Sequence, residues 1–322
     1  MSKLPTISVR VARKQQEAVD ICTFELVAED SAPLPAFSAG SHVGVHLPGG
    51  LTRPYSLCND STESHRYLIG VLRDPASRGG SNAMHDEVAE GQLLQISAPA
   101  NHFSLAHEAT RHLLLAGGIG VTPVLCMAER LANSGADFEM HYCTRSHERT
   151  AFHQRIATSS FAPKVNFHFD DGAAEQRLDI PALLGAPASG VHFYVCGPKG
   201  FMDAVLNTAR AKGWPEDQLH YEFFAGTVTK SDTDASFEVQ LVSSGKIVRV
   251  PADKTVVQAL ADAGVEVQMS CEQGVCGTCL TRVIEGIPDH KDMYLTPEEQ
   301  AANDQFTPCC SRSKSARLVL DL

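Results

Sequence analysis

Short runs in which apolar and polar residues alternate fill the first third of the chain. Turn-forming residues separate these runs. Alternation with a period of two is typical of strands that bury one face. The pattern therefore predicts an antiparallel β-barrel or sandwich over residues 1–108. The runs are TISVRVARKQ, ICTFELVAE, HVGVHLP, TRPYSLCN, YLIGVLR and QLLQISAPA.

After residue 108 the pattern changes to apolar strands that alternate with helical stretches. In RHLLLAGGIGVTPVLCMAERLANSG, residues 111–135, a strand is followed by glycines and then by an amphipathic helix. Further strands are predicted in FEMHYCTR, KVNFHFD and VHFYVCG. Strands that alternate with helices indicate a parallel sheet covered by helices, so we expect an α/β domain over residues 109–227.

A polar stretch, TVTKSDTDAS, begins the last third of the chain, and residues 228–236 are predicted to be a linker. Beyond it, FEVQLVSSGKIVRVP has the pattern of a β-hairpin that turns at Ser-Ser-Gly. TVVQALADAG has the pattern of an amphipathic helix, and ARLVLDL that of a closing strand. We therefore expect a third domain over residues 237–322.

Length and composition agree with three globular domains. The chain has 322 residues, 43% of them hydrophobic, and no apolar run approaches the roughly 18 residues of a membrane span. A net charge of −11 argues against a nucleic-acid-binding protein, which needs a basic face. The N-terminus lacks the apolar segment of a signal peptide. We expect a cytoplasmic protein with neither a nucleic-acid nor a membrane partner.

Four of the ten cysteines have a spacing that is typical of an iron–sulfur site. Cys271, Cys276 and Cys279 lie in CEQGVCGTCL with the spacing C-x4-C-x2-C, and Cys309 follows 30 residues later. This is the ligand spacing of plant-type [2Fe–2S] clusters, in which each iron binds two thiolates. A four-cysteine zinc site is the main alternative, but such sites usually have two C-x2-C pairs and this loop has one.

Residues around these cysteines refine the prediction. Gly274 and Gly277 suit a tight loop whose backbone N–H groups approach the cluster sulfurs. Because Cys309 and Cys310 are adjacent, either could be the fourth ligand; we favour Cys309 and expect Cys310 to face the core. Most of the cysteines that stand alone are expected to be small core side chains. These are Cys22, Cys58, Cys126, Cys143 and Cys196.

Small-residue turns follow two of the strands predicted in the second domain. LLLAGGIGVTP places Gly118 and Gly120 between a strand and a helix, although Pro123 replaces the third glycine of the dinucleotide-binding fingerprint. YVCGP, residues 194–198, ends another strand in a similar way. Parallel strands bring their carboxyl ends to one edge, so these turns predict a crevice for a nicotinamide dinucleotide. A plain tight turn is the alternative.

Two short stretches of the first domain suit a flavin. In RPYSL, Arg53 can neutralise a phosphate, while Tyr55 and Ser56 can flank an isoalloxazine ring. SRGGSNAMH, residues 77–85, offers a Gly-Gly-Ser turn whose backbone N–H groups could hold an anion. Taken alone, a Tyr-Ser pair on a strand is usually packing, and such a turn is usually only a turn.

Taken in order, RPYSL, RGGS, GGIGVTP, CGP and the four-cysteine set resemble the phthalate dioxygenase reductase family. This family includes the vanillate O-demethylase reductases and lies within the ferredoxin–NADP reductase superfamily. The resemblance covers essentially the whole chain. It implies an antiparallel β-barrel that binds FMN, a parallel-sheet α/β domain that binds NADH, and a C-terminal plant-type ferredoxin domain of β-grasp fold with a [2Fe–2S] cluster.

The resemblance also implies roles for individual residues. The residues that should contact FMN are Arg53, Tyr55 and Ser56. The residues that should hold its phosphate are Gly79, Gly80 and Ser81. The nicotinamide crevice should be lined by Gly118, Gly120, Thr122, Cys196, Gly197 and Pro198. Phe224 resembles the family's aromatic residue near the flavin, although Phe223 leaves the register uncertain by one. Ser56 and Phe224 are the candidates at the flavin edge.

Thr144 and Arg145 match the segment that follows the second strand of the family's NAD domain. Arg145 is the one basic residue suited to a 2′-phosphate, and Asp170 and Asp171 would disfavour that group. NADH is therefore expected in preference to NADPH. FMN is expected because the resemblance implies it, and the residues leave FAD open.

These features predict an electron-transfer reductase. Hydride should pass from NADH to FMN, and single electrons should then pass through the [2Fe–2S] cluster to a protein acceptor. No catalytic acid, base or nucleophile is assigned. The resemblance implies a monomer that transiently contacts a Rieske-type terminal oxygenase, which hydroxylates or O-demethylates an aromatic acid. The alternatives are a reductase for a separate soluble ferredoxin and a non-enzymatic redox-sensing or metal-bridged protein.

Overall fold

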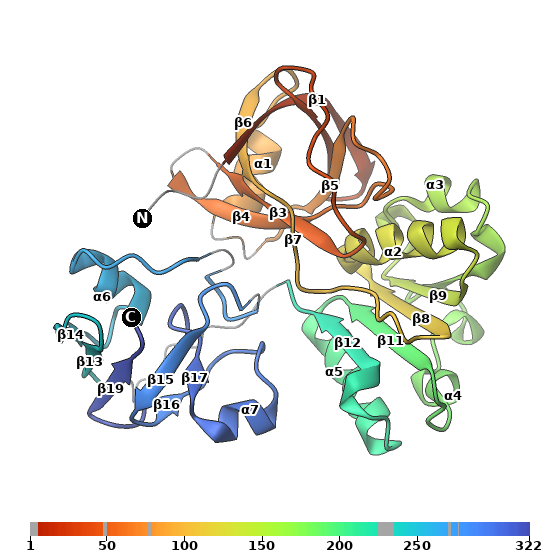
Figure 1. Cartoon of the computed structure of the whole chain (residues 1–322). Coiled ribbons are helices and arrows are strands. Elements are labelled where there is room, and N and C mark those ends of the chain that lie inside the picture. The colour runs from red at the N-terminus through yellow and green to blue at the C-terminus, as the bar shows by residue number, and fades with distance from the viewer. Residues whose placement is uncertain are drawn as a thin grey trace. The chain divides into compact units, whose positions relative to one another are not determined.

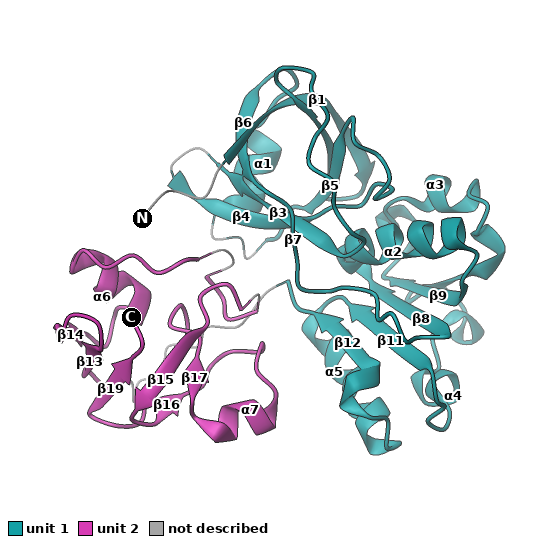
Figure 2. Cartoon of the chain, in the orientation of Figure 1, with its two compact units in different colours: residues 1–224 teal, residues 225–322 magenta. Residues whose placement is uncertain are grey.

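The computed structural model describes residues 6–47, 50–75, 77, 79–224, 235–269, 272–275 and 277–322. The chain forms two compact units, Met1–Phe224 (unit 1) and Ala225–Leu322 (unit 2), shown in Figure 2. Unit 1 combines the two domains predicted before the linker, so the boundary at residue 108 remains a prediction. Most of the predicted linker lies outside the described residues.

The first sheet of unit 1 is antiparallel and curls into a barrel (Figure 1). Its strand order is β4-β3-β6-β1-β2-β5, and β7 also pairs with β3. A bridge between Leu57 and Ile69 joins the two ends of this order and closes the barrel. The elements are β1 (Thr6–Ala18), β2 (Ile21–Ala28), β3 (Ser41–His46), β4 (Thr52–Ser56), β5 (Tyr67–Leu72), α1 (Gly80–Asp86), β6 (Leu93–Ser97) and β7 (Ala100–Asn101).

The second sheet of unit 1 is parallel, with the order β10-β9-β8-β11-β12. β8 is buried at every position after Arg111, as expected for a central strand that is covered on both faces. The strands are β8 (Arg111–Gly117), β9 (Asp137–Thr144), β10 (Val165–Phe169), β11 (Val191–Cys196) and β12 (Leu219–Glu222). The α-helices are α2 (Val121–Ser134), α3 (His153–Ala157), α4 (Ile180–Leu184) and α5 (Lys199–Ala211). The short 3-10 helices are η2 (Gly118–Gly120), η3 (His147–Arg149), η4 (Ala162–Lys164), η5 (Ala174–Gln176) and η6 (Glu216–Gln218).

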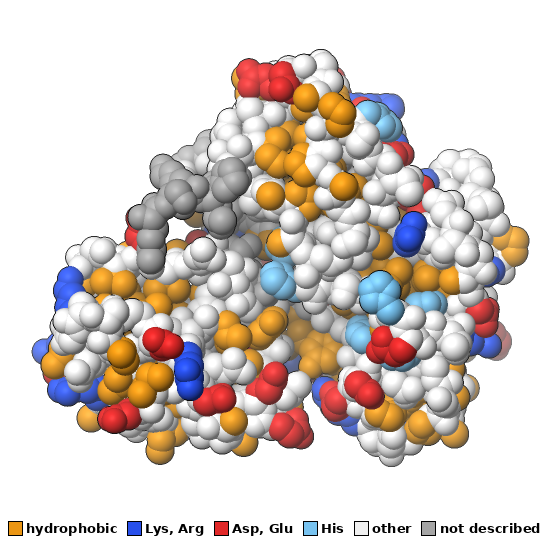
Figure 3. Space-filling model, viewed as in Figure 1, with side chains coloured by type: hydrophobic (Ala, Val, Ile, Leu, Met, Phe, Trp, Pro, Cys, Tyr) orange, Lys and Arg blue, Asp and Glu red, His pale blue; other side chains and the backbone are white. Residues whose placement is uncertain are grey.

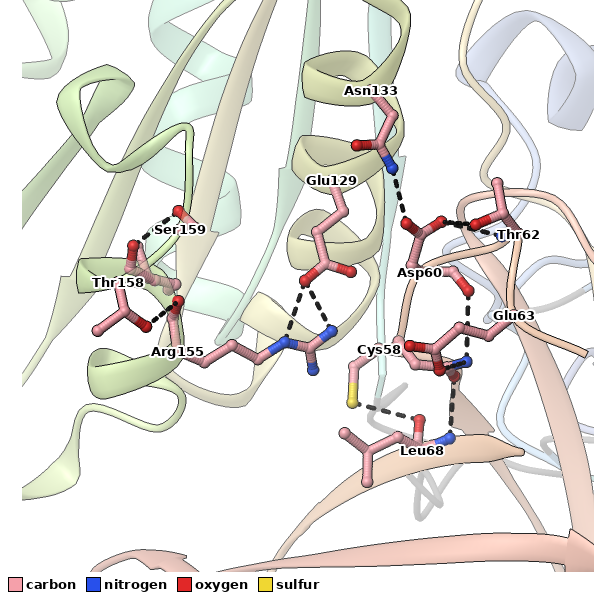
Figure 4. Close-up of polar contacts among 12 residues, drawn as sticks. Cys58, Asp60, Thr62, Glu63, Leu68, Glu129, Asn133, Arg155, Thr158 and Ser159 are labelled. Atoms are coloured by element: carbon pink, nitrogen blue, oxygen red, sulfur yellow. Dashed lines mark hydrogen bonds and ion pairs between the residues drawn. The ribbon is translucent and has the colours of Figure 1, made fainter. Parts of the chain in front are cut away.

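Polar side chains join the barrel to the parallel sheet within unit 1 (Figure 4). Asn133 on α2 donates a hydrogen bond of 2.6 Å to Asp60 in the barrel. Beside this contact, Arg155 on α3 donates two hydrogen bonds, of 3.0 and 2.7 Å, to Glu129 on α2. Burial raises the pKa of Glu129, because few waters remain to solvate its carboxylate. These groups line an open cavity of about 300 Å³.

Unit 2 is a mixed sheet with the order β14-β13-β19-β15-β17, together with a two-stranded sheet of β16 and β18. The elements are β13 (Phe237–Leu241), β14 (Ile247–Val250), α6 (Val256–Asp262), β15 (Thr281–Glu285), β16 (Pro288–Asp289), α7 (Pro297–Ala302), β17 (Gln305–Phe306), β18 (Arg312–Ser313) and β19 (Arg317–Leu320). The predicted hairpin is β13 and β14, with Gly245 at a φ of +66° in its turn. Thr255 and Gln258 form a reciprocal capping box at the start of α6.

The surface carries charged side chains of both signs. On the face shown in Figure 3, acidic and basic side chains are interspersed and do not form one broad field. Among the helices of the described residues, none is long and apolar enough to cross a membrane.

Candidate functional site

Two neighbouring strands of the parallel sheet end side by side in small residues. β8 runs into η2, and β11 ends at Cys196, which pairs with Ala116 in the strand register. A Cβ atom on Gly120 would overlap the backbone carbonyl of Cys196. A Cβ atom on Gly197 would lie 2.9 Å from the Cα atom of Gly117. The two strand ends can therefore approach this closely only because both turns carry glycine.

Thr122 lies between the η2 turn and the barrel. Its side chain is buried, and its hydroxyl donates a hydrogen bond of 3.0 Å to the carbonyl of Ile119 in η2. Its methyl group contacts Gly70 of the barrel strand β5, where a Cβ atom would lie 2.9 Å away. Thr122 thus packs the turn against the barrel, and its predicted place in the lining of the crevice remains a prediction.

The end of barrel strand β4 meets the end of β12 at this edge. The Ser56 hydroxyl is buried and donates a hydrogen bond of 3.4 Å to the Glu222 carboxyl group. Burial raises the pKa of Glu222 to about 8, and the bond from Ser56 offsets only part of that shift. Burial, followed by the nearby Glu222, also raises the pKa of Cys196. The structure therefore brings together the predicted residues Ser56 and Cys196.

Glu222 is a member of this site that the sequence did not reveal. It ends the apolar strand in LHYEFF, where a carboxylate could equally have been a solvated strand end. The signal for its role is its contact with Ser56, which lies 166 positions earlier in the chain. Phe223 is buried and meets Tyr221 edge-on at 5.6 Å, whereas Phe224 is only partly buried. Phe224 is thus the more exposed of the two rings, and its predicted place at the flavin edge remains a prediction.

The residues predicted to hold a phosphate come from separate segments that lie side by side. Arg53 on β4 lies against Gly80 at the start of α1, where a Cβ atom would be 2.6 Å from the arginine Cγ atom. Gly79 has a φ of +95°, a backbone angle that residues with a side chain rarely adopt. The Ser81 hydroxyl accepts a hydrogen bond of 3.1 Å from the Asp74 amide. A guanidinium beside two glycines is an arrangement that can hold a phosphate group, and this role remains a prediction. Tyr55 is partly buried against the barrel core, and burial raises its pKa.

The segment after β9 is held in place by its own hydroxyl groups. Thr144 is buried, and its hydroxyl lies 2.8 Å from that of Thr150. Arg145 is exposed, and its carbonyl accepts a hydrogen bond of 3.2 Å from the Asp171 amide. The Asp170 amide similarly bonds to the Thr144 carbonyl at 3.0 Å. The two aspartates that are predicted to oppose a 2′-phosphate therefore bond through their backbone amides to the predicted nucleotide-binding segment.

In unit 2, two of the four predicted cluster ligands can be located. Cys279 and Cys309 are both 4% exposed and belong to one small buried group with Cys310 and Val257. Cys271 and Cys276 lie outside the described residues. Cys279 and Cys309, which are 30 residues apart in the chain, can supply two of the four thiolates that a [2Fe–2S] cluster requires.

The loop glycines are required by their surroundings. Gly274 and Gly277 have φ values of +69° and +70°. A Cβ atom on Gly274 would overlap the Cys310 sulfur, and one on Gly277 would overlap the Tyr294 ring. The Cys310 sulfur also lies 3.2 Å from the Thr307 hydroxyl. The Cys310 sulfur thus packs between the glycine loop and Thr307, and the choice of Cys309 as the fourth ligand remains a prediction.

Comparison with known proteins assigns the chain to a family. The family described as 2Fe-2S iron-sulfur cluster binding domain matches residues 239–314. The N-terminal domain family of dimethylamine monooxygenase subunit DmmA-like proteins matches residues 97–219. Vanillate O-demethylase oxidoreductase of Pseudomonas putida is 56% identical over 317 residues, which cover 98% of this chain and 100% of that protein. The chain belongs to the vanillate O-demethylase and phthalate dioxygenase reductase family.

Other members of the family agree in sequence and in structure. Phthalate dioxygenase reductase of Burkholderia cepacia is 40% identical over 98% of this chain and 97% of that protein. A solved phthalate dioxygenase reductase, described as a modular structure for electron transfer from pyridine nucleotides to [2Fe–2S], covers 98% of both chains with a TM-score of 0.77 and 40% identity. The predicted family and the predicted fold class are thus confirmed. The chain is an oxidoreductase, the reductase component of an oxygenase system.

Proposed function

We propose that this chain passes electrons from NADH, through FMN and a [2Fe–2S] cluster, to a terminal oxygenase. The observation that carries the proposal is the meeting of Ser56, Glu222 and Cys196 at the mouth of the small-residue crevice, in a chain that also has a cluster-binding unit. When bound, a flavin accepts electrons in pairs as hydride and releases them singly, which an iron–sulfur cluster requires. The residues themselves bind and orient these groups.

FMN is assigned to the barrel edge. Arg53 and the turn of Gly79, Gly80 and Ser81 form a seat that matches one phosphate group, which is the terminal group of FMN. Tyr55 and Ser56 lie further along the same strand, on the path from this seat to the crevice. The strand therefore holds both ends of the flavin, and Ser56 at its end supplies a hydroxyl beside the reacting edge.

The crevice between β8 and β11 is assigned to the nicotinamide. Gly118 has open space where a Cβ atom would lie and so leaves room for a flat ring, whereas Gly120 and Gly197 let the two strand ends pack closely. Cys196 and Pro198 complete this wall. Glu222 has a pKa of about 8, so it keeps its proton at neutral pH. A neutral carboxyl adds no negative charge at the point where hydride arrives, and it can still hydrogen-bond to Ser56.

The dinucleotide is assigned as NADH. Its adenosine end is expected at Thr144 and Arg145, after β9. The backbone amides of Asp170 and Asp171 bond to this segment. The carboxylates of these two residues would repel the extra phosphate of NADPH. Arg145 alone would have to offset both charges.

The cluster is assigned to Cys271, Cys276, Cys279 and Cys309, with Cys310 outside the ligand set. Exposed apolar side chains flank this loop in sequence or contact it: Met269 is 45%, Leu280 37% and Tyr294 36% exposed. Apolar groups around the exit point suit a transient protein contact. We propose that the oxygenase contacts this rim.

The partner is proposed to be a Rieske-type oxygenase that acts on an aromatic acid. Relatives named for vanillate O-demethylase and for phthalate 4,5-dioxygenase support this class of substrate. We further propose a monomer in the cytoplasm, where a reducing environment suits the free cysteines found among the described residues. A reductase for a separate soluble ferredoxin is the competing function.

A visible spectrum and one variant test the proposal. The purified protein should show flavin and iron–sulfur absorption together with acid-labile sulfide. Cys276→Ser should abolish reduction of cytochrome c by NADH, while NADH still bleaches the flavin absorbance. Cys143→Ser, in unit 1, is the control and should keep both activities. A colourless protein, or one-electron output that survives loss of the cluster, would contradict the assigned route.

A further inference from the structure

A carboxylate lies buried beneath the cluster loop of unit 2. The Asp292 side chain is fully buried, and its Cα and Cβ atoms pack against Gly274, with 3.0 and 2.9 Å to the position that a Cβ atom would take there. The next residue, Met293, donates an amide hydrogen bond of 2.9 Å to the Gly274 carbonyl. Gly274 lies between the predicted ligands Cys271 and Cys276. The chain therefore places a buried acid directly behind the loop.

The carboxylate is held by specific contacts. Its Oδ2 atom accepts a hydrogen bond of 2.8 Å from the Leu295 amide, and its Oδ1 atom accepts one of 3.2 Å from the Ser311 hydroxyl. The Ser311 hydroxyl also lies 3.1 Å from that of Thr307, which in turn lies 3.2 Å from the Cys310 sulfur. This network connects Asp292 to the residue next to the predicted ligand Cys309.

A histidine also lies beside the carboxylate. The His290 Nδ1 atom is 3.5 Å from the Asp292 Oδ1 atom, and only 7% of the His290 side chain is exposed. Both ring nitrogens are buried and have no hydrogen-bond partner among the described residues. The pair therefore lies in a region from which water is largely excluded, where a charge acts over a longer range than it does at the surface.

We propose that Asp292 is a positioning residue that lowers the reduction potential of the [2Fe–2S] cluster. Reduction adds one electron, and hence one negative charge, to a cluster that four thiolates already make negative. A buried carboxylate behind the loop opposes that step through its charge. It also fixes the loop through Gly274. This inference rests on the proposed function, because it requires a cluster at Cys271, Cys276, Cys279 and Cys309.

The consequence concerns where the electron rests. A cluster of low potential holds an electron weakly, so it passes the electron on to the acceptor. Without the carboxylate, the cluster would keep the electron for longer. NADH would then reduce the cluster more completely, while delivery to the acceptor would slow down.

The test is a potential titration of the purified full chain, followed by cluster absorption at fixed pH. Asp292→Asn keeps the size of the side chain and a hydrogen-bond acceptor but removes the charge. At a potential where wild type is half reduced, the ratio of reduced to oxidised cluster should rise at least tenfold, which corresponds to an upward shift of about 59 mV. The control, Asp304→Asn, removes an exposed acid of the same unit and should change this ratio by less than about twofold.

A second variant keeps the proposal testable if Asp292→Asn does not assemble a cluster. Ser311→Ala retains the carboxylate but removes a hydrogen bond that spreads its charge. The ratio of reduced to oxidised cluster should then fall, in the direction opposite to that of Asp292→Asn.

Three outcomes would overturn the inference: a ratio in Asp292→Asn within the range of the Asp304→Asn control, a ratio that falls in Asp292→Asn, or a ratio in Ser311→Ala that does not fall. Failure of the proposed function is distinguishable from these, since wild type itself would then show no cluster absorption to titrate.

Discussion

The Ser56 hydroxyl donates a 3.4 Å hydrogen bond to the Glu222 carboxyl group and so joins the end of barrel strand β4 to the end of β12. The two residues come from different sheets of unit 1. In the proposed route, a flavin held by the barrel would meet a nicotinamide held by the parallel sheet beside this contact. Because both groups are buried, the surrounding protein and not bulk water determines the protonation of Glu222 and the hydrogen bonding of both.

Replacing Glu222 with glutamine should remove a pH dependence of stability from unit 1. The folded carboxyl has a pKa of about 8, whereas an unfolded glutamate ionises near about 4.3. Between these values only the unfolded state loses its proton, so the free energy of unfolding falls as pH rises, and this contribution is constant above about pH 8. We expect the variant to gain about 2–4 kcal/mol over wild type at pH 8 and almost nothing below about pH 4.

Urea unfolding at a series of pH values, followed by the fluorescence of Trp214, measures this effect. Trp214 is the single tryptophan and lies in unit 1. Glu148→Gln, at an exposed position of the same unit, is the control and should track wild type at every pH. A constant difference between Glu222→Gln and wild type across the series would show that the carboxyl is not held neutral.

Gly120→Ala should damage the crevice, because its methyl group would overlap the Cys196 carbonyl. We expect the rate at which NADH reduces the flavin to fall by at least tenfold, which corresponds to about 1.4 kcal/mol of lost transition-state stabilisation. Gly200→Ala on α5 is the matched control, because its Cβ atom would meet open space. Stopped-flow absorbance compares the two, and equal rates would remove the crevice from the proposed route.

Replacing each of the two adjacent cysteines with serine should have different effects on the cluster content of the protein. Cys309→Ser should lose most of the cluster, because a serine hydroxyl is a poor replacement for a thiolate ligand. Cys310→Ser should keep it, since the Cys310 sulfur already contacts the Thr307 hydroxyl at 3.2 Å. Iron and acid-labile sulfide per chain measure both. The reverse result would assign the fourth ligand to Cys310.

Arg155→Ala should destabilise unit 1 by about 2–3 kcal/mol at neutral pH, because it leaves the largely buried Glu129 without its cation. Arg149→Ala removes an ion pair to Asp20 whose side chains are 36% and 45% exposed, so it should cost less than about 1 kcal/mol. Urea unfolding followed by Trp214 fluorescence distinguishes the two. Equal losses would show that the contact between Arg155 and Glu129 is no stronger than one at the surface.

The sequence was most informative where chemistry depends on local spacing. Cys271, Cys276 and Cys279 fall within nine residues, and Gly118 and Gly120 lie two residues apart, so a linear pattern can reveal them. The alternation of strands and helices also predicted the type of each sheet, because burial of one or both faces leaves a period in the chain.

Contacts between distant segments could not be predicted in this way. Glu222 and Asp292 are ordinary acids in the sequence, and only the folded chain surrounds them with Ser56 in one case and with Gly274 and Ser311 in the other. The joining of the two N-terminal domains into one compact unit is of the same kind. It depends on side chains such as Asn133 and Asp60, which lie 73 positions apart.

The glycine contact between the two strand ends has a practical consequence for redesign. The floor of the crevice is backbone against backbone, so Gly120 and Gly197 offer no side chain to exchange. Arg145, in contrast, is exposed and comes directly after β9 and the buried Thr144. A redesign that aims at a different dinucleotide should therefore replace Arg145 and leave Gly120 and Gly197 unchanged.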